Sequence, residues 1–403
     1  MEATLPADQS SYRPPWRLMV GGGLVIFMLI PIVWLAVTGK LPAPTSVDGF
    51  KEFVNALSVP EISLSFFFTP LFIACFVFYK EWTQPKVAAP LLLLFCILYF
   101  GSMAIDHDYF LILQKPDNVP ISMMMLGTGI TLWWGLRQAA INDERIRKGQ
   151  PLLEEGKDDK VLVWPDLVYT ELICIVIGSA ILVLWSVVLR APLEAPANPA
   201  GPPNPSKAPW YFLGLQEMLV YFDPWMAGVI LPGMIITGLI AMPYCDTNSQ
   251  RPFIILNWMV GFLVLWVVLI VFGTFLRGPN WNFFGPYQAW DAQFQPAMTN
   301  INMSDYFWNS KGLVGFGLGM NLPENMWIRE APGILFTIAW CFVLPVVLAR
   351  TVMRRMYQQM GAIRFYIMAI HFVVMAMMPL KMVLRWTLTL KYFIYLPEFN
   401  FNL

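Results

Sequence analysis

The chain has 403 residues, of which 57% are hydrophobic and 13% charged, and its mean hydropathy is +0.57. This composition is typical of a membrane protein and excludes an ordinary soluble domain. The net charge is zero and no large basic patch is present, which argues against nucleic acid as a partner.

Apolar, charge-free windows long enough to cross a bilayer recur along the chain. They run 18–39, 62–79, 87–105, 118–136, 172–189, 224–245, 252–276, 331–349 and 365–380. The last window is the shortest, and it needs snorkelling by Arg364 and Lys381 at its ends. We therefore predict an all-α polytopic membrane protein with about nine transmembrane helices.

The distribution of cations predicts the orientation of these helices. Six Lys and Arg residues lie between Arg137 and Lys160, and four lie between Arg350 and Arg364. Lys and Arg concentrate in cytoplasmic loops, so both segments are predicted inside, together with the N-terminus. We expect a multi-pass protein of the inner (cytoplasmic) membrane, with the loop after the fifth window on the outer side.

The apolar windows and the charged segments divide the chain into five parts. One of them is the long outer loop 277–330, which is rich in aromatic residues, and we expect this loop to pack against an extramembrane subunit. The tail has Lys381, Arg385 and Thr389 at helical spacing, as expected at a membrane interface. The parts are a four-helix membrane region 1–136, a charged cytoplasmic linker 137–163, a three-helix unit 164–276, the outer aromatic loop 277–330, and two helices with an interfacial tail 331–403.

A proline-rich loop, 194–209, leads into Trp210-Tyr211-Phe212. Prolines fix φ and remove donors, so the loop is predicted to be stiff and non-helical. A helix-compatible run follows over 210–221, with Pro209 suited to its first turn. A rigid loop that feeds a short aromatic helix at a membrane surface could wall a pocket for a flat amphiphile such as a quinone.

This loop resembles the one that lines the quinol-oxidising site in the cytochrome b family, where Pro-Glu-Trp-Tyr is followed by Phe. Val163-Trp-Pro-Asp-Leu167 resembles the start of subunit IV of the plastoquinol–plastocyanin reductase, and Glu194-Ala-Pro-Ala-Asn-Pro199 resembles the start of its outer loop. The resemblance covers about 160–276. It implies a membrane subunit of a respiratory or photosynthetic cytochrome bc-type quinol–cytochrome c oxidoreductase. The implied quinol-binding residues are Pro209, Trp210, Tyr211 and Phe212.

One departure from the family pattern affects catalysis. Pro209 stands where the family has the glutamate that is thought to take a proton from quinol, and proline cannot do so. Glu217 follows Trp210 by seven residues, on the same helix face and among apolar neighbours, so we take it as the catalytic candidate. An inert, hydrogen-bonded interfacial carboxylate is the alternative. Asp223 is the second candidate, with a helix N-cap as its simpler explanation.

The histidine count limits the cofactors. Two bis-histidine haems need four histidines, and this sequence has two, His107 and His371. We expect quinone as the cofactor and haem b in a partner chain, with none ligated by this chain alone. No Cys-x-x-Cys occurs, so we expect no metal site here. His371 is either a ligand to a shared haem or, preferably, a hydrogen-bonded intramembrane residue. His107 is either interfacial or part of a proton exit.

Two carboxylates lie at the inner end of the fifth window. Asp166 follows Trp164-Pro165, which is a good helix start, and an acid in the first turn is favoured by the helix dipole. The functional alternative is an inner quinone or proton-uptake site formed by Asp166 and Glu171, for which the resemblance favours Asp166.

The resemblance also implies partners. They are a haem-bearing cytochrome b chain, a Rieske-type or other iron–sulfur protein, a c-type cytochrome and the lipid bilayer. The chain would be an enzyme as one subunit, not alone, with quinol oxidation coupled to proton translocation. The alternative is a redox-inert membrane anchor or assembly subunit. A transporter is disfavoured, because His371 is almost the sole ionisable group within the apolar windows.

Overall fold

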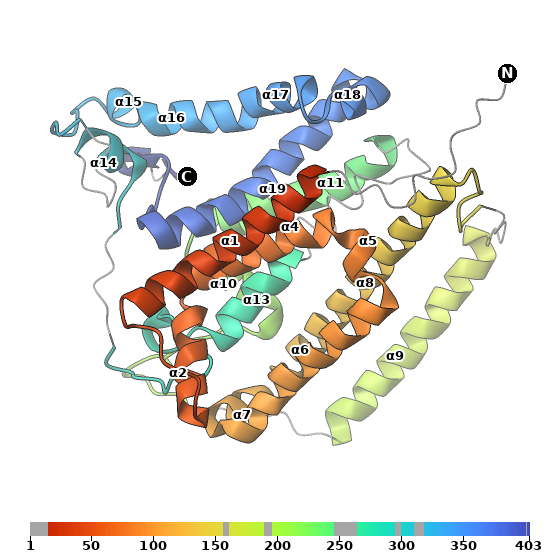
Figure 1. Ribbon diagram of the computed structural model, residues 1–403, viewed down its shortest axis with the longest axis horizontal. Coiled ribbons are helices and arrows are strands. Elements are labelled where there is room, and N and C mark those ends of the chain that lie inside the picture. Colours follow the sequence, from red (N-terminus) through yellow and green to blue (C-terminus); the bar gives the residue numbers. More distant parts are fainter. Residues whose placement is uncertain are drawn as a thin grey trace. The chain divides into compact units, whose positions relative to one another are not determined.

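The computed structural model describes residues 15–155, 161–188, 196–245, 264–294, 300–309, 318–399 and 401–403. Figure 1 shows a chain built almost entirely from helices. In these residues, eight helices are long and apolar enough to cross a membrane. They run Trp16–Val37, Pro60–Val77, Pro85–Ile105, Val119–Arg147, Val163–Val188, Met226–Cys245, Ala331–Arg350 and Ala362–Leu388. The predicted all-α polytopic membrane class is confirmed.

The expected window 252–276 is missing from this set. Its described part is α13 (Leu265–Phe275), an apolar helix of 11 residues. Positions 252–263 lie outside the described residues, so a span across the whole window stays a prediction.

The described residues divide into two compact units, one drawn from 1–133 with 204–403 and the other from 134–203. The N-terminal part of the larger unit is a run of helices with short connections. Its elements are α1 (Pro15–Val37), α2 (Val47–Ser58), α3 (Pro60–Ile62), η1 (Ser63–Phe68), α4 (Thr69–Val77), α5 (Tyr79–Trp82), α6 (Pro85–Ile105), α7 (His107–Gln114) and the start of α8 (Val119–Arg147).

Local chemistry accounts for the shape of these helices. Pro70 lacks an N–H, and its ring would clash with the carbonyl four residues earlier in a regular α-helix. The segment just before it, η1, is accordingly wound as a π-helix. The Asp106 carboxylate caps α7 by accepting from the Tyr109 N–H at 2.8 Å, and it pairs with Lys51 of α2 at 2.9 Å. Ser122 and Tyr99 share a hydrogen bond of 2.9 Å between α8 and α6.

The rest of the larger unit carries the candidate site. Its elements are α10 (Trp210–Met218), η3 (Met226–Ile230), α11 (Leu231–Cys245), α13, η5 (Pro279–Trp281), α14 (Met303–Trp308), α15 (Met326–Arg329), α16 (Ala331–Ile338), η6 (Ala339–Val343), α17 (Leu344–Arg350), α18 (Arg354–Met360), α19 (Ala362–Leu388), β1 (Tyr395–Leu396), η7 (Pro397–Phe399) and β2 (Phe401–Asn402). The two short strands pair antiparallel.

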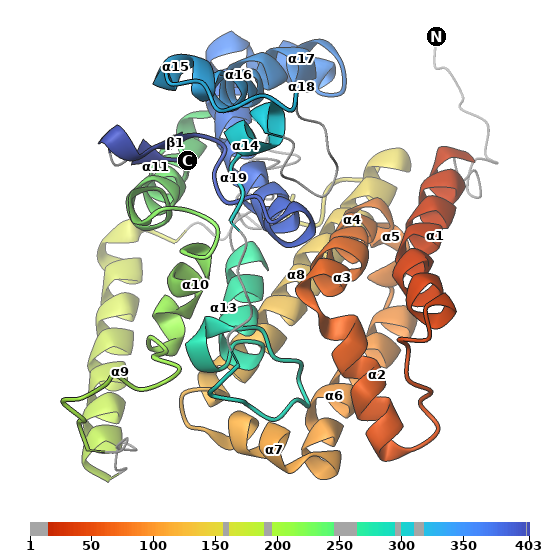
Figure 2. The same cartoon turned by 90° about the vertical axis from the view of Figure 1, so that its left-hand side faces the viewer.

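Helices α10 and α13 lie side by side (Figure 2). Gly214 of α10 faces α13, where a Cβ atom would stand 3.0 Å from the Trp266 ring and 3.2 Å from Ile270. The absence of a side chain therefore lets the two helices approach closely. Helix α10 is shorter than the expected run to Tyr221. It ends at Met218, a few residues before Pro224, which disfavours helical backbone in the residue before it.

Helix α19 corrects the expectation for the last window. It has 27 residues rather than the 16 of the window 365–380, so it does not need snorkelling at its ends to reach spanning length. Lys381 lies within the helix and is fully buried, where we expected it at a helix end. The helix continues through Arg385 and Trp386 to Leu388 because this stretch lacks Gly and Pro.

The smaller unit comprises the end of α8, η2 (Val163–Leu167) and α9 (Val168–Val188). Helix α8 runs to Arg147, beyond the apolar window, because the charged segment holds good helix formers and a Glu144–Lys148 pair at 2.7 Å. No side chain of α9 is buried. A helix that is apolar around its whole circumference is suited to a surrounding of lipid or other membrane helices.

Candidate functional site

The aromatic start of α10 presents two rings to the outside. The side chains of Tyr211 and Phe212 are 51% and 53% exposed, and their ring centroids lie 4.8 Å apart. Trp210 meets Tyr211 edge-on at 5.6 Å but is half-buried against the core beside α13. Of the four predicted quinol-binding residues, Pro209 precedes the helix, Tyr211 and Phe212 lie on its exposed face, and Trp210 lies on the half-buried face.

The loop before α10 is braced by side-chain hydrogen bonds. Asn204 and Asn280 make two, in which the Asn204 Nδ2 donates to Oδ1 of Asn280 at 3.0 Å and the Asn280 N–H donates to Oδ1 of Asn204 at 2.6 Å. Gln216 accepts from the Ala208 N–H at 2.8 Å and donates to the Ser206 carbonyl at 2.9 Å. These bonds hold the chain that leads into Pro209. Residues 189–195, including Glu194, lie outside the described residues.

Lys207 ties the same loop to the end of α13. Its Nζ donates to the Thr274 carbonyl at 2.7 Å and lies 5.0 Å from the centre of the Trp290 ring. Burial lowers the pKa of Lys207 to about 7, with smaller contributions from the cations Lys115 and Arg277. Sequence reasoning did not find this residue. Its position three residues before Trp210 is the feature of the sequence that could have indicated a role for Lys207 near the site.

Glu217 lies on the face of α10 that packs against α13, and it forms an ion pair with Arg277. Arg277 Nε donates to Oε2 at 3.0 Å and its terminal nitrogen donates to Oε1 at 2.7 Å. Both side chains have no exposed surface. The guanidinium also donates to the Trp281 carbonyl at 3.1 Å. Two parallel charge-assisted bonds fix the geometry of the carboxylate.

Two aromatic side chains extend this pair. The Tyr221 hydroxyl donates to Oε1 of Glu217 at 2.9 Å, and the Trp386 indole N–H donates to that hydroxyl at 3.0 Å. The guanidinium carbon of Arg277 lies 4.9 Å from the centre of the Trp386 ring. Burial, and then the Glu217 charge, raises the pKa of Tyr221 well above its ordinary value. The Tyr221 hydroxyl is therefore held as a hydrogen-bond donor.

The electrostatics of the pair favour charged partners. Burial alone would lower the pKa of Arg277, but the Glu217 carboxylate outweighs it and the pKa is raised.

Glu217 and Trp210 share the buried face of α10, as expected, whereas Tyr211 and Phe212 lie on the exposed face. We call Glu217, Arg277, Tyr221 and Trp386 the buried network. Arg277 lies 60 residues from Glu217, and a cation directly after an apolar window was the signal for it.

Asp223, the second candidate, is held by the C-terminal segment. Its carboxylate accepts from the Tyr392 hydroxyl at 2.6 Å and from Nδ2 of Asn402 at 2.7 Å. Asp223 directly precedes the helical turn that begins at Pro224, and its carbonyl accepts from the N–H groups of Met226 and Ala227, as the carbonyl of an N-cap residue does. The N-cap explanation therefore fits the backbone, while the carboxylate itself is used by residues far along the chain.

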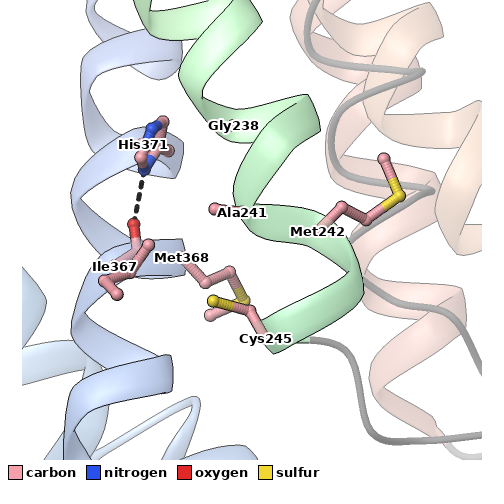
Figure 3. Close-up of a pocket in the computed structure, with 7 residues that line it drawn as sticks. All are labelled: Gly238, Ala241, Met242, Cys245, Ile367, Met368 and His371. Carbon is pink, nitrogen blue, oxygen red and sulfur yellow. Dashed lines mark hydrogen bonds between the residues drawn. The ribbon is translucent and has the colours of Figure 1, made fainter.

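His371 lines a small pocket between α11 and α19 (Figure 3). Its Nδ1 lies 2.6 Å from the Ile367 carbonyl, and because a carbonyl only accepts, Nδ1 carries the proton. Nε2 lies 3.4 Å from the Thr237 hydroxyl. The pocket volume of about 10 Å³ holds roughly one water molecule and is far too small for a quinone ring or a haem. His107 begins α7 and stacks on Phe110.

Asp166 and Glu171 lie in the smaller unit, at the start of the fifth span. Both side chains are exposed and both stand in a first helical turn. The Asp166 carbonyl accepts from the Thr170 hydroxyl at 2.9 Å. Within the described parts of the chain, no three or more His, Cys, Asp or Glu side chains gather in a way that could hold a metal ion.

Comparison with known families identifies the segment that carries the site. Residues 196–287 match the family model described as Cytochrome b(C-terminal)/b6/petD. No solved structure matches. The match begins in the proline-rich loop, passes through α10, α11 and α13, and includes both Glu217 and Arg277. Val163–Leu167 and Glu194 precede it. The predicted resemblance is confirmed, and this chain is a multi-pass membrane protein with a cytochrome b C-terminal-like segment.

Proposed function

We propose that this chain forms part of the quinol-oxidation site of a cytochrome bc-type quinol–cytochrome c oxidoreductase. The observation that carries the proposal is the exposed Tyr211–Phe212 ring pair, which begins a short helix inside the family-matched segment. Aromatic faces bind flat rings through offset or edge-on contacts. The braced loop before Pro209 supports this role, because a pocket wall that is already rigid loses little entropy when it binds.

Oxidation of a quinol releases two electrons and two protons. In the proposed complex, one electron passes to a Rieske-type or other iron–sulfur partner and the other to haem b in a partner chain. The electron on the iron–sulfur partner passes to a c-type cytochrome, the electron on haem b passes to quinone at an inner site, and the two protons leave on the outer side. Tyr211 and Phe212 orient the quinol ring in this scheme. Pro209 and Trp210 hold the wall in place from behind.

Glu217 is the proposed proton acceptor, and because it lies on the buried face of α10 a proton from quinol beside Tyr211 and Phe212 would reach it through an intervening water or donor. Its Oε1 accepts two hydrogen bonds and its Oε2 accepts one from Arg277, so Oε2 is the oxygen with room for a further bond. A proton that arrives there weakens the ion pair, while Arg277 keeps its bond to the Trp281 carbonyl. Proton transfer and opening of the Arg277 contact are thus coupled in the proposal.

The donor set of this chain does not fit the haems of a cytochrome b. The sequence has two histidines, one at the start of α7 and one within α19, and the pocket beside His371 has room for about one water. Two bis-histidine haems need four such ligands. We therefore assign haem b to a partner chain. The exposed carboxylates Asp166 and Glu171 are the proposed groups for proton uptake on the inner side.

Turnover of the assembled complex tests the proposal. Glu217→Gln keeps the size of the side chain and removes the titrating oxygen, so quinol-dependent cytochrome c reduction should fall by at least roughly tenfold. Tyr211→Ala should weaken binding of quinol or a quinone-site inhibitor through loss of the ring wall. Glu330→Gln is the matched control, because Glu330 is also fully buried and paired with an arginine, Arg329. Unchanged turnover in both test variants would overturn the proposal.

A redox-inert anchor or assembly subunit is the second candidate. The closed ion pair of Glu217 with Arg277 favours it, because such a pair can serve packing alone. In that case Glu217→Gln and Arg277→Gln should reduce the amount of assembled complex in proportion to lost stability. Turnover per assembled complex should then stay at the wild-type value.

A further inference from the structure

Three cations gather at the C-terminal end of α19 without a carboxylate partner. They are Lys381, Arg385 and Lys391, and in the described parts of the chain none of them forms a salt bridge. A surface cation needs no partner, but a buried or half-buried cluster of like charge is costly unless something compensates it. This feature is independent of the proposed redox function.

Lys381 is the most unusual of the three. Its side chain has no exposed surface and its Nζ has no hydrogen-bond partner. The ammonium lies 4.1 Å from the centre of the Phe393 ring, and 5.8 Å and 5.9 Å from those of Phe222 and Tyr392. Cation–π contacts of this kind recover part of the lost hydration but leave the three N–H donors unpaired.

Arg385 lies one helical turn further along and is half-buried. One terminal nitrogen donates to the Thr389 carbonyl at 3.1 Å and the other to Oδ1 of Asn300 at 2.7 Å. Both acceptors are neutral, and a guanidinium has five N–H donors, so donors remain for an anion. The negative end of the α19 dipole favours a cation here but does not account for Lys381, which lies two turns from the helix end.

Backbone pairing brings Lys391 to the same place. The Ile301 N–H donates to the Thr389 carbonyl at 3.3 Å, and the Lys391 N–H donates to the Ile301 carbonyl at 2.8 Å. Asn300, the partner of Arg385, therefore lies beside Lys391. The hydroxyl of Thr389, between the two cations in sequence, is buried and has no hydrogen-bond partner.

The neighbouring carboxylate does not neutralise this cluster. Asp223 attracts Lys381 electrostatically, but its oxygens accept from Tyr392 and Asn402. One carboxylate against three cations leaves an excess of positive charge. The cluster also stands at the end of a membrane-spanning helix, where the phosphates of lipid headgroups lie.

We propose that Arg385 and Lys391 bind the phosphate of an anionic phospholipid headgroup, beside the buried Lys381. A phosphodiester offers the acceptor oxygens that arginine recognises best. Its negative charge offsets the excess of the cluster. The acyl chains would then lie along α19, whose length matches a bilayer.

The test uses the full-length chain in a neutral detergent. Phosphatidylglycerol, phosphatidylcholine and inorganic phosphate are titrated separately, and the thermal unfolding midpoint is recorded. Phosphatidylglycerol should raise the midpoint in a saturable way, and Arg385→Gln should weaken its apparent affinity about fivefold, as expected for one basic contact. Arg364→Gln is the matched control, because Arg364 is an exposed arginine at the other end of the same helix. Its affinity should equal that of the wild type.

The outcomes separate the sources of the phosphate. A shift with phosphatidylglycerol that inorganic phosphate does not reproduce supports the lipid headgroup. An equal shift with inorganic phosphate that Arg385→Gln removes supports the same site with a free phosphate as its occupant. An equal phosphatidylglycerol response in Arg385→Gln and Arg364→Gln, or none in the wild type, overturns the proposal. If Arg385→Gln does not fold, Lys391→Gln takes its place with the same expectation.

Discussion

Arg277 and Glu217 form a bidentate ion pair, with bonds of 3.0 Å and 2.7 Å, that joins the residues just after α13 to the C-terminal end of α10. Neither side chain touches solvent. The pair connects α10 with α13, two helices of the family-matched segment, and the Tyr221 hydroxyl adds a third bond to the carboxylate. Its stability and its proposed chemistry therefore depend on the same atoms.

Breaking this pair from one side should be costly. Arg277→Gln leaves a buried carboxylate without its counter-ion, and Glu217→Gln leaves a buried guanidinium, so each should lose about 3–5 kcal/mol of unfolding free energy. The double variant removes both charges and should lose less than the sum, with a coupling of about 1 kcal/mol or more. Denaturant unfolding of the purified chain measures all three. Additive losses would mean that the pair does not act as a unit.

The pH dependence of stability should reveal Lys207. Its pKa is lowered to about 7 by burial, from an ordinary value of 10.5. Between these values the unfolded chain binds more protons than the folded chain, so this residue makes stability rise with pH across that window. The unfolding midpoint of the wild type, relative to Lys207→Met, should therefore increase from pH 7 to pH 10.

A matched variant isolates this effect. Lys86 is exposed, so the difference in unfolding midpoint between the wild type and Lys86→Met should not change with pH over the same range. A Lys207 difference that is also flat would show that the amine is as well solvated in the folded chain as in the unfolded one, and a difference that falls with pH would show that folding raises its pKa. Either result contradicts the prediction.

Much of the helical framework could be predicted from the sequence, because membrane spans are recognised by length and lack of charge. The prediction failed where polar residues continue a helix. Lys381 marked an apparent end, yet α19 runs on to Leu388 and encloses the lysine among aromatic rings. Whether a lysine reaches the surface depends on the segments packed around it. Here these are Phe393 of the C-terminal segment and Phe222 after α10.

The candidate site was predictable in part. The aromatic triplet and Glu217 follow from local spacing on one helix. Arg277 does not, because pairing across 60 residues is decided by how α10 and α13 pack. The exposure of Tyr211 and Phe212 likewise depends on which face of α10 meets α13. Gly214 favours this face, since a side chain there would stand 3.0 Å from the Trp266 ring.

Gly214 gives a direct test of that packing. Gly214→Ala places a methyl group 3.0 Å from the Trp266 ring, and overpacking of this kind typically costs about 1–3 kcal/mol. Gly228→Ala is the control, because nothing lies within 4 Å of a Cβ there. Thermal unfolding should show a lower midpoint for Gly214→Ala and an unchanged or higher one for Gly228→Ala, since alanine favours helix. Equal midpoints would mean that the helices can separate slightly without cost.

The orientation of the chain remains the prediction with the widest consequence. The cation bias places the segment after Arg137 in the cytoplasm and the loop before α10 outside. Single cysteines at Lys148 and Ser206, both exposed, should therefore react with an impermeant thiol reagent from opposite sides. In intact cells, Ser206→Cys should be labelled and Lys148→Cys should not, and membrane disruption should expose both.

The five native cysteines must first be replaced, because Cys174 is exposed and would react as well. With that background, the two positions report on the two ends of the fifth span. If Lys148→Cys is labelled in intact cells and Ser206→Cys is not, the Tyr211–Phe212 rings face the cytoplasm. Proton release at Glu217 would then be on the inner side, where it could not contribute to proton translocation outward, and the quinol-oxidation proposal would have to be abandoned.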